Sequence, residues 1–311
     1  HPAMSSQSPV TCPPWLLEKA SENPPLRTAI VNAGTALVME SVRDAAGAGL
    51  INPVLFGDKR DIERIAGEIG WDLADIDIIQ ASSEGEAAST AAFAAGAGEV
   101  GALMKGHVHT DTYLRAILKK EANLRTGRRL THLFMMSLPG RDGPFFISDA
   151  ALNAHPDEIT LQTIIANVVD TAHAMGITKP KIALLSATET PSDAVPSSVQ
   201  AASLSDWSKS AISDADVSGP LAFDLAVSPD AAKIKGVSDP VAGQADAIIV
   251  PDIVSGNALF KSMVHFNSAC AAGLVVGARV PVLLTSRADP PAARLASAAL
   301  ASIVARGAEV R

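Results

Sequence analysis

Side chains capable of acid–base or anion chemistry follow four apolar runs that are typical of strands. They gather in the segments KGHVHTD, SDA, PDIVSGN and TSRAD. The candidate site residues are Lys105, His109, Thr110, Arg115, Asp149, Asp252, Asn257, Lys261, Ser286, Arg287 and Asp289. Because ligands of open α/β sheets bind at the carboxyl ends of the strands, we expect these side chains to meet there. The four cations among them suit a small, multiply charged anion such as phosphate.

Each candidate also has an ordinary structural explanation. A single Lys or Arg at a strand end is more often a solvated charge, although four at equivalent positions favour a site. His107, His109 and Asp111 would share one face of a strand and could hold a metal ion. Their spacing is not that of a catalytic zinc site, so phosphate contact, capping or hydrogen bonding is favoured. The three aspartates of the set could equally cap turns or helices.

Two nucleotide-binding motifs are excluded. Residues 96–101 match GxGxxG, but they follow a predicted helix and precede a predicted strand. That order is the reverse of the one that dinucleotide binding requires. No glycine is followed directly by lysine, so GxxxxGK[ST] does not occur, and nucleotide hydrolases that use it are excluded.

Short apolar runs alternate with helix-length segments along the chain. Strands are predicted at residues 28–32, 53–56, 76–79 and 100–104, all buried, and at 133–136, 144–147, 182–185, 247–250 and 280–284. Helices are predicted at residues 35–48, 59–69, 84–97, 161–175, 257–272 and 291–306. The alternation predicts an α/β fold with a mostly parallel sheet covered on both faces. The segment LPGRDG predicts a hairpin between the runs 133–136 and 144–147, and the Ser-rich stretch 200–216 predicts surface helix and loop.

Length and composition narrow the class further. A chain of 311 residues favours two α/β domains, predicted as residues 1–128 with 278–311, and residues 129–277. The net charge of −8 and the lack of a long Lys/Arg run disfavour nucleic acid. No stretch approaches the roughly 18 apolar residues of a membrane span. Two cysteines and no secretory-type start predict a cytoplasmic protein, and the opening HPAM is interpreted as a remnant of an expression vector.

Seven segments together resemble the phosphate acetyltransferase / phosphate butyryltransferase family. They are LMKGHVHTDTYLRAIL, THLFMMSLP, ISDAALNAHPD, PKIALLSATE, SGPLAFDLAVS, AGQADAIIVPDIVSGNALFK and PVLLTSRAD, in family order over residues 103–289. The resemblance implies an enzyme that interconverts acyl-CoA and phosphate with acyl phosphate and CoA. It also implies a two-domain fold like that of isocitrate and isopropylmalate dehydrogenases, with the active site in the cleft between the domains. A homodimer is expected, with CoA and phosphate as substrates and with no metal or other cofactor.

The resemblance also assigns roles. Ser286 and Arg287 match the family's catalytic Ser-Arg pair. Arg115 matches the Arg that follows the HxT segment, and Lys261 matches the Lys that follows the GN pair. Attack of a CoA thiolate on an acyl phosphate in a ternary complex needs a base, an oxyanion donor and cations for the phosphate. The family's catalytic Asp is replaced by the sequence Ala-Ala-Arg at residues 292–294, so the nearest carboxylate, Asp289, is assigned as the thiol base.

Other activities stay open at this point. TSRAD is closer to the butyryl branch of the family, although acetyl is slightly favoured as the acyl group. An acyl-carrier-protein:phosphate acyltransferase would need an apolar or basic docking surface. A non-catalytic CoA- or phosphate-binding protein would be favoured by loss of the Ser-Arg pair, which is present. A metal-dependent decarboxylating dehydrogenase shares the fold but needs an aspartate cluster that the sequence lacks.

Overall fold

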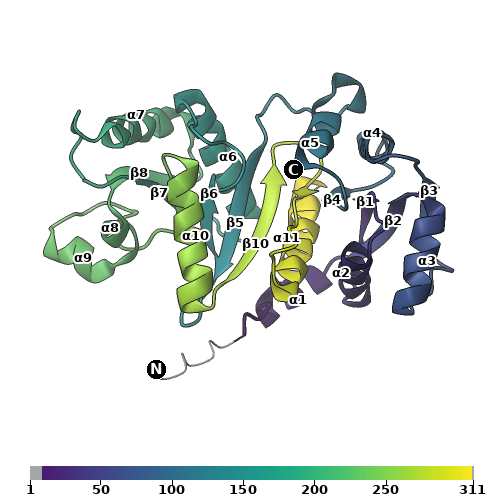
Figure 1. Cartoon of the computed structure of the whole chain (residues 1–311). Coiled ribbons are helices and arrows are strands. Elements are labelled where there is room, and N and C mark those ends of the chain that lie inside the picture. The colour runs from purple at the N-terminus through teal and green to yellow at the C-terminus, as the bar shows by residue number, and fades with distance from the viewer. Residues whose placement is uncertain (1–8, 310–311) are drawn as a thin grey trace, which may run out of the picture. The chain divides into compact units, whose positions relative to one another are not determined.

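The computed structural model describes residues 9–309, so the predicted vector remnant lies outside the described residues. The chain divides into two compact units, whose elements are labelled in Figure 1. We call Thr11–Leu130 with Ala272–Arg311 the first unit, and Thr131–Ala271 the second unit, which also takes in residues 9 and 10. Each unit has its own paired strands and its own core. The domain boundaries predicted from the sequence stay a prediction.

The first unit has the strand order β3-β2-β1-β4-β11-β10. Its strands are β1 (Leu26–Val31), β2 (Ile51–Gly57), β3 (Asp77–Gln80), β4 (Ala102–Lys105), β11 (Val282–Leu283) and, from Ala272 onward, β10 (Cys270–Val276). Its helices are α1 (Pro14–Ser21), α2 (Ala36–Gly47), α3 (Lys59–Ile69), α4 (Glu84–Gly96), α5 (Thr110–Leu118) and α11 (Pro291–Glu309), with a 3-10 turn η1 at Lys120–Ala122. All neighbouring strands are parallel except β10 and β11.

The register of these strands brings distant segments to one edge. In β1 and β4, Val31 lies opposite Lys105, and in β11 and β4, Leu283 lies opposite Met104. Because the three strands are parallel, the residues that follow them leave the sheet at the same edge. The segments that begin after Val31, Lys105 and Leu283 therefore lie side by side.

The second unit has the strand order β5-β6-β9-β7-β8. Its strands are β5 (Thr131–Ser137), β6 (Phe145–Ser148), β7 (Lys181–Leu185), β8 (Asp216–Leu221) and β9 (Ala247–Ile249). Its helices are α6 (Glu158–Ala174), α7 (Pro196–Ala211), α8 (Phe223–Val227), α9 (Pro229–Ile234) and α10 (Ile253–Asn267). β5 and β6 form the predicted antiparallel hairpin, and the other neighbours are parallel.

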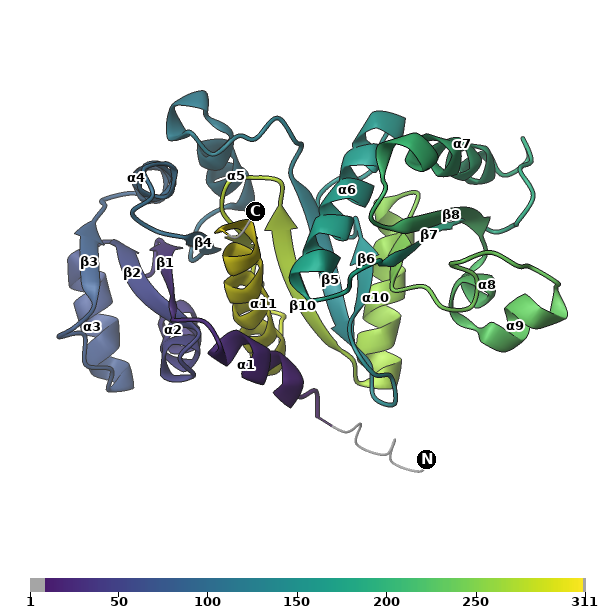
Figure 2. The same ribbon diagram turned by 180° about the vertical axis from the view of Figure 1, so that it is seen from behind.

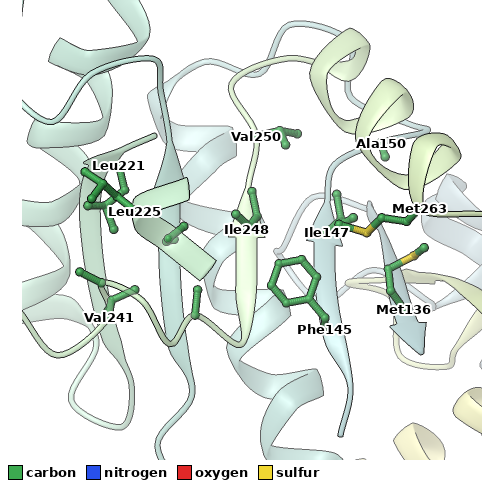
Figure 3. Close-up of a cluster of buried hydrophobic side chains, with 14 of the residues drawn as sticks. Met136, Phe145, Ile147, Ala150, Leu221, Leu225, Val241, Ile248, Val250 and Met263 are labelled. Carbon is green, nitrogen blue, oxygen red and sulfur yellow. The ribbon is translucent and has the colours of Figure 1, made fainter. Parts of the chain in front are cut away.

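Buried apolar side chains form the core of the second unit. Phe145 and Ile147 of β6 and Ile248 of β9 pack with Met263 of α10, which covers this part of the sheet (Figure 3). Each of the four is at most 8% exposed, so burial of apolar surface is the main stabilising contribution. Packing of this kind fixes α10 against the strands whose ends carry the candidate residues.

The mostly parallel α/β architecture is confirmed, but three local predictions are wrong. Residues 76–79 were expected to be a buried strand, whereas β3 is exposed or half-buried because it pairs with β2 alone at an edge of the sheet. The helix predicted at 257–272 ends at Asn267, and the next residues form β10. The strand face that would have carried His107, His109 and Asp111 does not exist, because α5 begins at Thr110.

The order of elements around the GxGxxG match is as predicted. α4 ends at Gly96, and β4 begins at Ala102, so a helix precedes the motif and a strand follows it. A Cβ on Gly96 would lie 1.7 Å from the carbonyl oxygen of Ala122. The glycine therefore permits close packing of two backbone segments, and no phosphate is needed to explain it. Within residues 9–309, no helix combines the length and the apolar character of a membrane span.

Candidate active site

A tight turn after β4 positions Lys105 and the residues that follow it. The N–H of Gly106 donates to the carbonyl oxygen of Val31 at 2.9 Å, and the N–H of His107 donates to that of Asn32 at 2.8 Å. The side-chain amide of Asn32 donates back to the carbonyl oxygen of His107 at 2.6 Å. A Cβ on Gly106 would lie 2.3 Å from the carbonyl oxygen of Val31, so only glycine allows this approach. The half-buried Lys105 is thus held by backbone contacts at the edge of the sheet.

The segment after β11 forms a turn that presents Ser286 and Arg287 to solvent. The carboxylate of Asp289 accepts the backbone N–H of Ser286 at 2.8 Å, and the hydroxyl of Ser286 accepts the N–H of Ala288 at 3.2 Å. Arg294 donates to the carbonyl oxygen of Asp289 at 2.7 Å. Burial raises the pKa of Asp289, while the Ser286 N–H and the Arg294 charge oppose that rise. Asp289 therefore orders the Ser286 turn in this structure.

Lys105 and Arg287 are close enough to repel each other. Burial lowers the pKa of Lys105 first, the charge of Arg287 lowers it further, and the charge of Glu84 opposes both effects. Among the residues that the structure describes, no carboxylate forms an ion pair with either cation. Two neighbouring cations without a paired carboxylate create a local positive potential, which favours a bound anion. This pair was predicted from the strand ends, and the structure brings it together.

A histidine–carboxylate pair lies beside these cations. His109 precedes the first residue of α5, and Glu84 is the first residue of α4. Nδ1 of His109 lies 2.8 Å and 3.0 Å from the two carboxylate oxygens of Glu84. The Thr112 hydroxyl also donates to Glu84 at 3.4 Å. The hydrogen bond from His109 is the largest cause that lowers the pKa of Glu84.

Glu84 was missed by reasoning from the sequence, because the candidates were sought only after strands. A signal for its position exists. Ser83 caps α4 by accepting the N–H of Glu86, and Glu86 reaches back to the N–H of Ser82. This S-x-x-E capping pattern places Glu84 in the first turn of α4. In Figure 2, α4 and α5 lie near one another in the first unit, as their packing contacts require.

Two predicted residues of α5 stay apart from this group. Thr110 and Arg115 are exposed, at the first position and in the last turn of α5. In the described part of the chain, neither residue forms a hydrogen bond or ion pair with Lys105 or Arg287, and neither is among the charges that shift the pKa of Lys105. Their assignment to substrate binding stays a prediction.

Asp149 organises the turn after β6 in the second unit. The carboxylate is 1% exposed and accepts the backbone N–H groups of His132, Ala151, Leu152 and Asn153. It also accepts the Asn153 side-chain amide at 2.7 Å. A buried carboxylate that accepts five N–H donors is well satisfied without a ligand. These contacts support a structural role for Asp149, and its predicted contact with substrate stays untested.

Helix α10, together with its capping residue, carries the other candidates of this unit. Asp252 caps the helix by accepting the N–H and the hydroxyl of Ser255 at 2.9 Å and 3.0 Å. The N–H of Ile253 donates to the carbonyl oxygen of Ala154, which fixes the helix to the Asp149 turn. Asn257 is half-buried and Lys261 is exposed four residues later, so both lie on one side of α10.

His132 is buried beneath this turn as a neutral ring. It is 3% exposed, and its Nδ1 atom has no hydrogen-bond partner among the described residues. Burial lowers the pKa of His132 to about 4, although the charge of Asp149 opposes the change. Its ring packs edge-on against Phe134, which stacks on Phe260 of α10. The described residues contain no group of three or more His, Cys, Asp or Glu side chains that could hold a metal ion.

Comparison with known proteins decides the family. Residues 84–302 match the family described as phosphate acetyl/butaryl transferase. The chain belongs to this family. It is 41% identical to the phosphate acetyltransferase of Rickettsia prowazekii over 291 residues, covering 93% of this chain and 83% of that protein. It is 38% identical to the phosphate butyryltransferase of Clostridium acetobutylicum over 280 residues, covering 90% of this chain and 93% of that protein.

Comparison with solved structures supports the same family and shows the same fold. A branched-chain phosphotransacylase from Enterococcus faecalis matches with a TM-score of 0.80 and 32% identity, over 90% of this chain and 99% of that one. A 4-hydroxythreonine-4-phosphate dehydrogenase from Burkholderia phymatum matches with a TM-score of 0.57 and 14% identity, over 90% and 98%. The second likeness concerns the fold alone. The predicted family and α/β fold class are confirmed, and the chain is a member of an acyltransferase family.

Proposed function

We propose that the chain is an acyl-CoA:phosphate acyltransferase for short acyl groups. The observation that carries this proposal is the unpaired cationic pair, Lys105 and Arg287, beside the exposed hydroxyl of Ser286. Membership of the phosphate acetyl/butyryl transferase family supplies the reaction that such a site suits. Coenzyme A and phosphate are then substrates, and neither a metal nor another cofactor is required.

The site residues take complementary roles in this proposal. Arg287 offers a planar pair of donors for the phosphate, and Lys105 adds a second positive charge. The hydroxyl of Ser286 donates to the oxyanion that develops on the acyl carbonyl, because none of residues 9–309 is a base hydrogen-bonded to it that would make it a nucleophile. Asp289 holds the turn that carries the pair. Transfer is direct, with acyl donor and acceptor bound together.

Acyl-chain length is set by small differences in free energy. The two relatives named for acetyl and butyryl transfer are 41% and 38% identical to the chain. Because one methylene changes discrimination by only about 1–3 kcal/mol, we propose that both acyl groups react and that acetyl is slightly favoured. The roles of Arg115, Asn257 and Lys261 are proposed to lie in substrate binding.

Phosphate-dependent release of CoA tests the function. Thiol release from acetyl-CoA and butyryl-CoA is measured with and without phosphate, and we expect it only when phosphate is present. Arg287→Gln should raise the KM for phosphate, since the bidentate donor is lost, by roughly the 10- to 150-fold that about 1.5–3 kcal/mol represents. Arg60→Gln, an exposed arginine of α3, is the matched control and should not change it.

Three outcomes would contradict the proposal. Thiol release that ignores phosphate would indicate a thioesterase. Turnover of an acyl-carrier-protein donor without turnover of acyl-CoA would favour the alternative acyltransferase. A stable acyl-enzyme trapped from acetyl-CoA alone would exclude direct transfer. The homodimer, the cytoplasmic location and a site between the domains stay predictions.

A further inference from the structure

The His109–Glu84 pair has the arrangement of an oriented acid–base group. A carboxylate can only accept hydrogen bonds at neutral pH, so Nδ1 must carry the proton in its contacts with Glu84. The neutral ring then presents the lone pair of Nε2 on the side away from the carboxylate. The imidazole side chain is 82% exposed, so this lone pair is accessible to a substrate.

The hydrogen bonds around Glu84 hold the ring in one orientation. Both carboxylate oxygens contact Nδ1, the backbone N–H of His109 donates to one of them at 3.4 Å, and Thr112 donates to the other. Because the donors come from the start of α5 and the carboxylate from the start of α4, the ring is positioned by two packed helices. Such support reduces the freedom that an exposed ring would otherwise have.

The pair lies next to the cations that are proposed to bind phosphate. Lys105 experiences the charges of both Glu84 and Arg287, so the carboxylate and the guanidinium lie within electrostatic range of one ammonium group. His109 follows Lys105 by four residues across the tight turn at Gly106. A proton acceptor is therefore present at the same edge of the sheet as the Ser286 turn.

Asp289 is less suited to accept the proton of a thiol. One carboxylate oxygen accepts the N–H of Ser286 and so holds the side chain against the turn, even though burial raises the pKa of Asp289. Its removal would disturb the turn itself. Nε2 of His109, in contrast, is part of an exposed side chain and does not hold the Ser286 turn in place.

We propose that His109 accepts and returns the proton during acyl transfer, and that Glu84 is its positioning residue. This inference rests on the proposed function. In the direction of CoA acylation, Nε2 takes the thiol proton while the sulfur–carbon bond forms, and the carbonyl electron pair moves onto oxygen. That pair returns as the bond to the phosphate oxygen breaks, and the imidazolium gives its proton to the departing phosphate. No electron is gained or lost, and His109 ends neutral.

His109→Gln tests the acid–base role, because glutamine keeps a polar side chain but cannot take a proton. We expect kcat at pH 7 to fall about 10²- to 10⁴-fold, with little change in the KM for phosphate. The deficit should shrink as pH rises through the ordinary thiol pKa of about 8.5, because CoA then ionises without a base. His107→Gln, an exposed histidine of the same loop, is the matched control and should keep the wild-type rate and pH profile.

Glu84→Gln tests the positioning role. A glutamine amide can donate to Nδ1 and so favour the tautomer that carries its proton on Nε2, which removes the accepting lone pair. We expect kcat to fall at least about tenfold, with a much smaller change in the KM for phosphate that follows the protonation of Lys105. Asp289→Asn, measured in parallel, should alter the KM for phosphate without the pH-dependent recovery.

The outcomes separate this inference from the function on which it rests. Wild-type enzyme without phosphate-dependent thiol release would contradict the proposed function. Active wild-type enzyme with an unchanged kcat in His109→Gln would overturn the inference alone. A deficit in His109→Gln of equal size at every pH would also overturn it, because lost structure does not recover with ionisation of the thiol. If kcat recovered at high pH in Asp289→Asn but not in His109→Gln, Asp289 would be identified as the base.

Discussion

At the scale of single residues, the candidate site depends on charges that lie near one another without neutralising one another. Lys105 and Arg287 repel each other, and Glu84 attracts Lys105 while it binds His109. Two cations arranged in this way create a local positive potential, which favours a bound anion. The pKa of Lys105 should therefore depend on the charges of Arg287 and Glu84.

Removal of either neighbouring charge should move the pKa of Lys105 in a defined direction. Arg287→Gln removes a repelling charge, so the pKa should rise; Glu84→Gln removes an attracting charge, so it should fall further. The measurement is an NMR titration of the Lys105 side-chain resonances. Because phosphate needs the protonated ammonium, its affinity should weaken as pH rises through the lowered pKa. Arg60→Gln should leave the titration unchanged, and a pKa that neither site variant shifts would show that the charges are not coupled.

Reasoning from the sequence found some of these residues and missed others for physical reasons. The proximity of Lys105 and Arg287 follows from the rule that parallel strand ends share an edge, and it was predictable. The His109–Glu84 pair was not, because Glu84 lies at a helix start, where an acidic residue is ordinary capping chemistry. The substrate contact predicted for Asp149 stays a prediction, and its carboxylate shows that such a residue after a strand can be engaged by its own turn and by a neighbouring strand.

At the scale of elements, backbone contacts rather than side chains fix the position of Lys105. The turn after β4 is held by hydrogen bonds to β1, and its close approach depends on the missing side chain of Gly106. The strand itself was predicted, because its apolar run is distinct. Its register against β1 and β11 was not, since a short parallel strand carries no local signal for its partners.

Gly106→Ala should therefore damage both stability and activity. The added Cβ would lie 2.3 Å from the Val31 carbonyl oxygen, so the turn must move and carry Lys105 with it. We expect a loss of about 1–3 kcal/mol in the free energy of unfolding, measured in urea, together with a lower kcat. Gly67→Ala in α3 is the control, because a Cβ there meets nothing within 4 Å and should stabilise by about 0.4–1 kcal/mol. Wild-type stability in Gly106→Ala would contradict the close approach.

The two strands that the sequence did not predict lack the usual signals. α10 ends at Asn267, and the residue after it, Ser268, has a φ of 54° where a glycine would have marked the end; β10 begins soon after, at Cys270. β8 contains Gly219 and Pro220, which are rare inside strands and common at sheet edges, where β8 lies. Both strands form because their neighbours supply hydrogen-bond partners, which local sequence does not reveal.

At the scale of the whole molecule, the first unit is assembled from two distant parts of the chain. α11 packs on α1, α2 and β11, and its central residues are almost wholly buried. The prediction of a C-terminal helix was correct, and its return to the N-terminal part was predicted from the sequence alone. Stability of the N-terminal strands should depend on this last helix.

Ala299→Asp tests that dependence. Ala299 is 0% exposed in α11, and a buried carboxylate without a partner costs several kcal/mol. Hydrogen–deuterium exchange should show β1, β2 and β4 losing protection, although they lie far away in sequence, while β6, β7 and β9 keep more of theirs. Arg306→Asp, at an exposed position of the same helix, should leave all of them protected. Full protection of β1 in Ala299→Asp would show that the stability of the N-terminal strands does not depend on the packing of α11.

The place of β11 between β4 and β10 has a consequence for synthesis on the ribosome. The roughly 140 residues of the second unit are translated after β4 and before β11, which takes on the order of ten seconds. During that interval the nascent chain holds β4 with one edge unpaired, a surface on which other chains can assemble. Arg287 is translated only after β11. A half-made polypeptide of this protein is therefore exposed to misassembly before the residues that close this edge are made.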